Sequence, residues 1–153
     1  MTKTRKPAPA LVLSVPSVTA FLATIRDATR RMAEVAGCDA GVAEQVALAV
    51  DEAATNVIEH AYGGAGDRQI ELRYRLAPDE LRVEIVDDGA PVDRRTLPEV
   101  DLVRYASERK SGGLGVHLMG RIMDAVTFRR TARGNVCCLV KRLGAGAEGR
   151  ESR

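Results

Sequence analysis

The stretch VALAVDEAATNVIEHAY, residues 46–62, decides which fold the sequence predicts. Its alanine, valine and isoleucine residues recur with the spacing of a helix that is buried along one side. Polar residues interrupt this pattern. Because positions four apart lie about 40° apart around a helix, Glu52 and Asn56 share one face, and Glu59 extends the same stripe. Taken alone, such a stripe is most often a solvated helix face, so it indicates function only if other motifs support it.

The residues before this stretch predict a strand and two helices. A short strand is expected at 11–15, and a helical pattern runs from about 18 to 35 and ends at Gly37. Asp39 is placed to cap the next helix, which is expected from about 40 to 61. The sequence YGGAGD then breaks that helix.

The second half of the chain is richer in strands. Apolar and polar residues alternate in RQIELRYRL (68–76) and again in LRVEIVDD (81–88). Because a short polar turn separates these two runs, they predict an antiparallel hairpin. A helix at 114–123 precedes two more strands at 125–130 and 135–142. The sum is an α+β fold, a two-layer α/β sandwich with helices on one face of a mostly antiparallel mixed sheet.

The composition limits the possible functions. A chain of 153 residues that is 45% hydrophobic and 29% charged suits a soluble domain, and 3% aromatic content without Trp predicts an aliphatic core. The formal net charge of +2 and the scarcity of stacking side chains argue against direct nucleic-acid binding. No apolar run approaches the roughly 20 residues of a membrane-spanning helix, so no membrane association is expected.

The cysteines and the chain ends give two further expectations. Cys38, Cys137 and Cys138 have no CxxC spacing, which favours reduced thiols in a cytoplasmic protein. One domain is expected at 10–143, between a flexible tail at 1–9 and a disordered tail at 144–153.

Two further motifs follow the opening helix. VDDGAP at 86–91 ends an alternating strand, where a carboxylate can point into a cleft and Gly89 lets the backbone pass close to a ligand. By itself it is also a common Asp-Gly turn. KSGGLGVHLM at 110–119 leads into a helix start, whose N–H groups can meet phosphate oxygens, although a simple hinge has the same composition. The long polar stretch at 89–112 between them is typical of a functional loop or lid.

The order of the three motifs resembles the N, G1 and G2 boxes of the GHKL ATPase and kinase superfamily. DEAATNVIEHAY, VDDGAPVD and GGLGVHLM are similar to the anti-sigma-factor serine/threonine kinases of the RsbW type, and the resemblance covers about 11–143. It implies the Bergerat ATP-binding fold, with ATP and Mg²⁺ as cofactors. Pro91 replaces a glycine of the wider superfamily and, with the following VD, favours the RsbW branch. Val92 departs from the Phe that RsbW members often carry.

The resemblance also implies roles for individual residues. Glu52 matches the general base, Asn56 matches the Mg²⁺ ligand, and Asp87 matches the residue that reads the adenine amino group. Gly89 matches the glycine that lines the base pocket, whereas Asp88 takes a variable and exposed position. The residues that it implies for the phosphates are Lys110, Gly113, Leu114, Gly115 and Val116.

The implied activity is ATP-dependent phosphorylation of a Ser or Thr on a STAS-domain anti-anti-sigma protein, by a kinase that also binds a sigma factor. The resemblance further implies a homodimer. It places Arg26 where related proteins use an arginine for partner contact, although a solvated helix face is the plainer interpretation. Two alternatives stay open: a non-catalytic ATP-binding partner-switching module of the same fold, and a small ATPase without a protein acceptor. The presence of both Glu52 and Asn56 favours the kinase.

Overall fold

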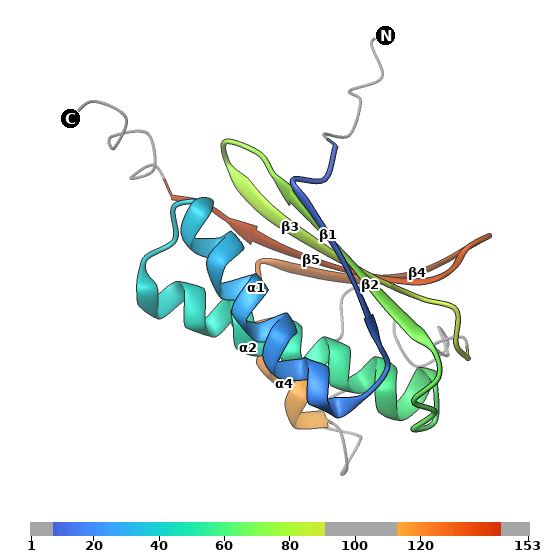
Figure 1. Ribbon diagram of the computed structural model, residues 1–153. Coiled ribbons are helices and arrows are strands. Elements are labelled where there is room, and N and C mark those ends of the chain that lie inside the picture. Colours follow the sequence, from blue (N-terminus) through green and yellow to red (C-terminus); the bar gives the residue numbers. More distant parts are fainter. Residues whose placement is uncertain (1–7, 91–112, 145–153) are drawn as a thin grey trace, which may run out of the picture.

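The computed structural model describes residues 8–90 and 113–144, which form one sheet and a layer of helices (Figure 1). The strands are β1 (Leu11–Pro16), β2 (Gln69–Leu76), β3 (Glu80–Asp87), β4 (Ala125–Thr131) and β5 (Gly134–Arg142). The helices are the 3₁₀-helix η1 (Thr19–Phe21), the α-helices α1 (Leu22–Val35), α2 (Ala40–Asn56) and α4 (Gly113–Ile122), and the π-helix η2 (Val57–Ala61).

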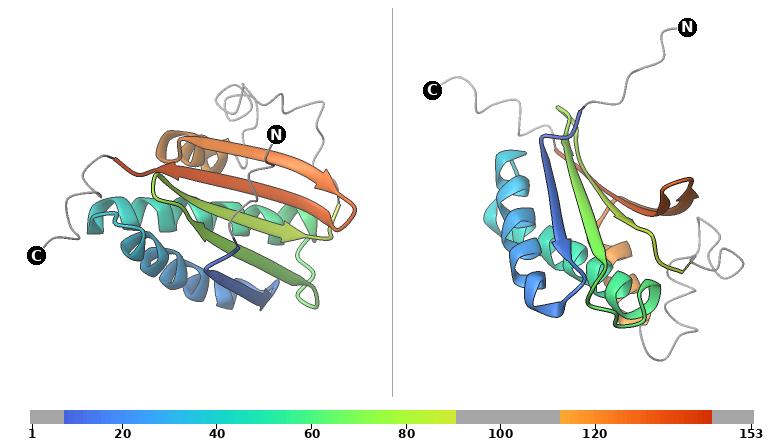
Figure 2. Two further views of the ribbon diagram at one scale, coloured as in Figure 1. Left: turned by 90° about the horizontal axis from the view of Figure 1, so that it is seen from above. Right: turned by 45° about the vertical axis from the view of Figure 1, so that its right-hand side comes forward.

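The strands form a single sheet in the order β1-β2-β3-β5-β4. The helices cover one face of this sheet, as the two views of Figure 2 show, so the expected two-layer α+β architecture is confirmed. All four pairings within the described ranges are antiparallel, which refines the mixed sheet expected from the sequence. The order places β3 at the centre and pairs its last residue, Asp87, with Asn135 of β5.

The core is aliphatic, as the composition predicts. The alternating residues of β2 and β3 that face the helices are completely buried; they are Ile70, Leu72, Tyr74, Leu81, Val83 and Ile85. The alanine and valine face of α2 packs on them. Tyr74 is the one large polar side chain in this layer, and its hydroxyl lies 2.8 Å from the hydroxyl of Thr29 on α1. The core therefore fixes α2 firmly over the middle of the sheet.

The helix boundaries agree with the sequence except at the end of α2. Asp39 caps this helix as expected, because its carboxylate accepts a hydrogen bond of 2.8 Å from the N–H of Val42. However, the α-helix ends at Asn56 and the next five residues form a π-helix, in which the N–H of Tyr62 donates to the carbonyl of Val57 at 3.0 Å. This wider turn was not predicted, because nothing in the local spacing of apolar residues distinguishes it.

Several expectations fall outside the described residues. The tails at 1–7 and 145–153, most of the long polar stretch at 91–112, and Lys110 are among them. Within the part of the chain that is described, no helix is long and apolar enough to span a bilayer.

The sheet makes a direct prediction about stability. Ile85 on the central strand is 0% exposed, whereas Val12 on the edge strand is 51% exposed. Ile85→Ala should lower the free energy of unfolding by roughly 2–5 kcal/mol, because it leaves a cavity in the core. Val12→Ala should cost less than about 1 kcal/mol. Urea unfolding measures both, and equal losses would contradict the buried position of Ile85.

Candidate functional site

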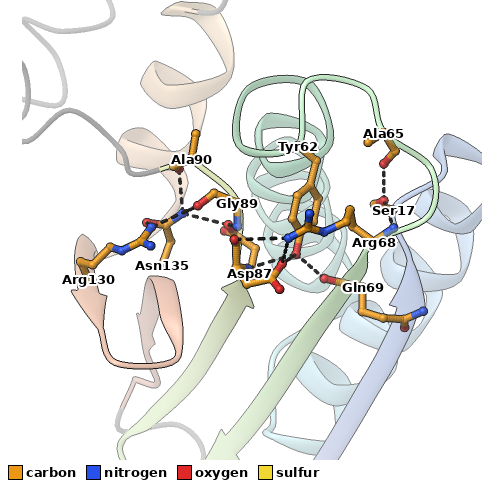
Figure 3. A network of polar contacts seen from close by, with 11 residues as sticks. Ser17, Tyr62, Ala65, Arg68, Gln69, Asp87, Gly89, Ala90, Arg130 and Asn135 are labelled. Atoms are coloured by element: carbon orange, nitrogen blue, oxygen red, sulfur yellow. Dashed lines mark hydrogen bonds and ion pairs between the residues drawn. The ribbon is translucent and has the colours of Figure 1, made fainter.

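Asp87 lies at the end of β3, and only 6% of it is exposed. Its Oδ1 atom accepts hydrogen bonds from the backbone N–H of Gly89 (2.9 Å) and from Nδ2 of Asn135 (2.8 Å) (Figure 3). No donor among the described residues reaches Oδ2. Burial raises the pKa of Asp87, while the two donors oppose that rise. Within the described residues, this carboxylate is therefore held through Oδ1 alone.

Asn135 is a site residue that sequence reasoning missed. Besides Asp87, its Nδ2 atom lies within hydrogen-bond distance of the carbonyls of Ala90 (2.9 Å) and Gly89 (3.4 Å). Arg130 on β4 donates to the side-chain oxygen of Asn135 at 3.1 Å and to the Gly89 carbonyl at 3.1 Å. The sequence signal that could have identified Asn135 is a single amide side chain in the otherwise apolar run NVCCLV. Asn135 thus links Asp87 to the backbone that follows it.

Gly89 has a role beyond the one expected from the sequence. The N–H of Ala90 donates to the carbonyl of Ala61, at the end of η2, at 2.8 Å. A Cβ atom on Gly89 would lie 2.4 Å from that same carbonyl oxygen, so only glycine allows this approach. The end of the α2–η2 segment therefore contacts the turn that follows Asp87 directly.

Glu52 and Asn56 lie on α2, ahead of this contact, and both are half-buried. The pKa of Glu52 is raised, first by burial and then by the negative charges of Asp51 and Glu59. A raised carboxyl pKa suits a group that accepts and releases a proton near neutral pH. The side chain of Asn56 makes no hydrogen bond to another described residue. Glu59 and His60 are exposed, with 4.0 Å between Oε2 of Glu59 and Nε2 of His60.

The glycine-rich motif forms the beginning of α4. Gly113, Leu114, Gly115 and Val116 are its first four residues, and α4 packs against α2. The first N–H groups of a helix have no partner inside it, so they can bind an anion. The structure therefore places the three sequence motifs on α2, at the end of β3 and at the start of α4.

The oxygen donors on α2 fit a magnesium ion. Amide and carboxylate oxygens, such as those of Asn56 and Glu52, are hard ligands that Mg²⁺ accepts. No group of three or more His, Cys, Asp or Glu residues that could hold a metal ion occurs in the described part of the chain. Mg²⁺ bound here would therefore take most of its ligands from phosphates and water, its usual mode beside a nucleotide.

Comparison with known proteins identifies the family of the chain. Residues 15–141 match the family model of the histidine kinase-like ATPase domain. The chain belongs to this ATPase family. It is 30% identical over 135 residues to the serine-protein kinase RsbW of Halalkalibacterium halodurans, covering 86% of this chain and 82% of that protein. RsbW of Bacillus subtilis is 28% identical over 118 residues, or 74% of each chain. The resemblance to RsbW-type proteins is thus confirmed.

Solved structures show the same fold. The Pseudomonas aeruginosa SiaB–SiaC complex contains a chain that matches with a TM-score of 0.58 and 17% identity, over 92% of this chain and 93% of that one. The histidine kinase domain of the Erythrobacter litoralis EL346 blue-light activated histidine kinase matches with a TM-score of 0.53 and 20% identity. That match covers 88% of this chain but 64% of the kinase domain.

One buried charge of this ATPase domain lies next to Glu52. Asp51 is 9% exposed, and its Oδ1 atom is buried without a hydrogen-bond partner in the described structure. Its Oδ2 atom lies 3.8 Å from Nη1 of Arg26 on α1. Burial raises the pKa of Asp51, and Arg26 opposes that rise. Arg26, which the resemblance places at a partner-contact position, therefore forms an ion pair with Asp51.

The buried carboxyl of Asp51 predicts a pH-dependent effect on stability. Because its pKa is raised above the ordinary value of 3.8, the folded protein holds this proton more tightly than the unfolded chain does. Its contribution to stability is therefore present below pH 3.8 and is lost as the pH rises through the folded pKa. Asp51→Asn should melt at a higher temperature than wild type at pH 7, with a smaller difference near pH 4.

Thermal unfolding followed by circular dichroism between pH 4 and pH 7 measures this difference. Asp79→Asn is the control, because Asp79 is exposed in the turn between β2 and β3. A difference between Asp51→Asn and wild type that stays constant across this range would show that the Asp51 carboxyl is not responsible.

Proposed function

We propose that this protein is an ATP- and Mg²⁺-dependent serine/threonine kinase that phosphorylates a STAS-domain anti-anti-sigma protein and also binds a sigma factor. One observation carries the proposal. The α2–η2 segment, which bears Glu52 and Asn56, ends in a direct backbone contact between Ala61 and Ala90, in the turn after Asp87. The groups suited to proton transfer and metal binding thus lie on a segment that contacts the strand end bearing the group suited to base recognition.

Each residue has a definite task in this proposal. Asp87 accepts a hydrogen bond from the adenine amino group through Oδ2, because Oδ1 is already occupied by protein donors. The first N–H groups of α4 bind the phosphates. Asn56 holds Mg²⁺, which neutralises the charge that develops on the transferred phosphoryl group. Glu52 accepts the proton of the attacking hydroxyl, a task that its raised pKa favours.

The proposed partners rest on the relatives. Relatives that match most of this chain are named serine-protein kinase RsbW. The SiaB chain that shares the fold was solved in complex with a second protein, SiaC. These names support a kinase that works with protein partners. We further propose that it is cytoplasmic, switches between those partners and forms a homodimer. The alternative is a module of the same fold that binds ATP and exchanges partners without catalysis.

Labelled ATP tests the two possibilities. The protein is incubated with γ-labelled ATP and each STAS protein of the same genome, with Mg²⁺ or with EDTA. Transfer to one STAS protein in the Mg²⁺ arm alone supports the kinase. A label that survives acid but is lost in alkali identifies a phosphoserine or phosphothreonine. Binding of ATP without transfer to any acceptor would support the non-catalytic module instead.

Glu52→Gln should keep nucleotide affinity and lose phosphotransfer. The amide preserves the shape of the side chain but cannot accept the hydroxyl proton, so the transfer rate should fall by about 100-fold or more. Glu59→Gln is the matched control, because Glu59 lies on the same stripe but is exposed. Transfer at the wild-type rate by Glu52→Gln would show that Glu52 is not the base.

Asn56→Ala should weaken nucleotide binding only when Mg²⁺ is present. Losing one metal ligand should raise the dissociation constant for Mg²⁺-ADP by about 10-fold and leave the metal-free value nearly unchanged. Titration calorimetry with Mg²⁺ and with EDTA separates the two values. Gln45→Ala is the control, because it removes an exposed amide from the other half of α2. It should alter neither dissociation constant. If Asn56→Ala binds as wild type does in both buffers, Asn56 does not hold the metal.

A further inference from the structure

The hydroxyl of Tyr62 is the centre of a hydrogen-bonded cluster that the proposed chemistry does not use (Figure 3). Tyr62 directly follows η2 and is 8% exposed. Its hydroxyl lies 2.5 Å from the carbonyl of Gln69 and 3.0 Å from Oδ1 of Asp88, and it accepts a hydrogen bond of 3.1 Å from the N–H of Asp88. One side chain thus connects the end of a helix, the start of β2 and the residue after Asp87.

Arg68 completes this cluster, which we call the Tyr62 cluster (Tyr62, Arg68 and Asp88). Its guanidinium donates to Oδ1 of Asp88 at 2.8 Å and lies over the ring of Tyr62, 5.2 Å from the ring centre. The backbone of Arg68 is fixed by Ser17, which is 1% exposed. The N–H of Ser17 donates to the Arg68 carbonyl at 2.9 Å, and its hydroxyl accepts from the Arg68 N–H at 3.2 Å.

The cluster and Asn135 hold the end of β3 from opposite sides. Asn135 binds the side chain of Asp87, whereas Tyr62 and Arg68 bind the backbone and side chain of Asp88. The direction of the Asp87 carboxylate is therefore determined by contacts with β5 on one side and with the segment before β2 on the other. Burial raises the pKa of Tyr62 to about 12, so its hydroxyl keeps its proton at neutral pH.

We infer that Tyr62 is a positioning residue for base recognition. Its hydroxyl and Arg68 hold Asp88, and so set the direction in which Asp87 presents Oδ2 to the adenine. The same contact fixes the distance between Asp87 and Asn56, because Tyr62 ends the segment that carries Asn56. This inference rests on the proposed nucleotide-binding function and adds three residues to it.

Removal of the Tyr62 hydroxyl should change which base is preferred. Tyr62→Phe retains the ring but lets the Asp88 segment move, so we expect ADP affinity to fall about 5-fold or more. Affinity for GDP should fall less, because a displaced Asp87 discriminates poorly between an amino group and a carbonyl. The preference for ADP over GDP should therefore narrow, and Asp87→Asn should narrow it further.

Tyr74→Phe is the matched control. Tyr74 is also a buried tyrosine whose pKa is raised to about 12, and its hydroxyl also has a hydrogen-bond partner, Thr29. It lies in the core between β2 and α1, away from Asp87. Tyr74→Phe should lower the free energy of unfolding about as much as Tyr62→Phe does. It should still bind both nucleotides as wild type does. Arg68→Gln, at an exposed position, gives a second variant that should fold normally and also narrow the preference.

Titration calorimetry with ADP and GDP, together with urea unfolding of each variant, decides the matter. If wild type binds neither nucleotide, the proposed function fails and the role of Tyr62 in it fails too. If wild type binds ADP but Tyr62→Phe and Tyr74→Phe have equal nucleotide affinities, the positioning role alone is overturned. An equal loss of ADP and GDP affinity in Tyr62→Phe would also overturn it, because that result is expected of a structural residue.

Discussion

The contact between the Ala61 carbonyl and the Ala90 N–H, 2.8 Å long, is the constraint on which the candidate site depends. It joins the end of the central helical segment to the end of the central strand. Glycine at position 89 is necessary because a Cβ atom there would lie 2.4 Å from the same oxygen. Together with the hydrogen bonds between Tyr62 and Asp88, this contact fixes the functional residues of α2 relative to Asp87 of β3.

The π-helix explains how the Ala61 carbonyl becomes available. The segment from Val57 to Ala61 forms i to i+5 bonds, such as Tyr62 to Val57, instead of continuing the regular α-helix. Single π-turns inside helices are often found at functional sites. Here the wider turn brings Tyr62 to Asp88 and aims the Ala61 carbonyl at Ala90. Asn56, the residue before this turn, therefore keeps its place on the regular helix while the segment after it meets β3.

Much of this fold could be predicted from the sequence because its signals are local. Helix and strand periodicity, the Asp39 cap and the β2–β3 hairpin each depend on neighbouring residues. The polar stripe of Glu52 and Asn56 became informative only beside two later motifs. Asn135 was missed because its meaning comes from a pairing with Asp87, 48 residues away in the chain. Tyr62 was missed for the same reason, since its contacts with Gln69 and Asp88 depend on the positions of other strands. The π-turn was missed because the spacing of apolar residues does not distinguish it from an α-helical turn.

The adjacent carboxylates Asp87 and Asp88 show how strand geometry divides one motif into two functions. Neighbouring residues at a strand end point in different directions. Asp87 turns toward Asn135 in a buried position, where desolvation raises its pKa. Asp88 turns toward Arg68 and Tyr62 near the surface, where the guanidinium lowers its pKa. The buried carboxylate suits recognition of a ligand that can satisfy it, and the exposed one suits anchoring the backbone that directs its neighbour.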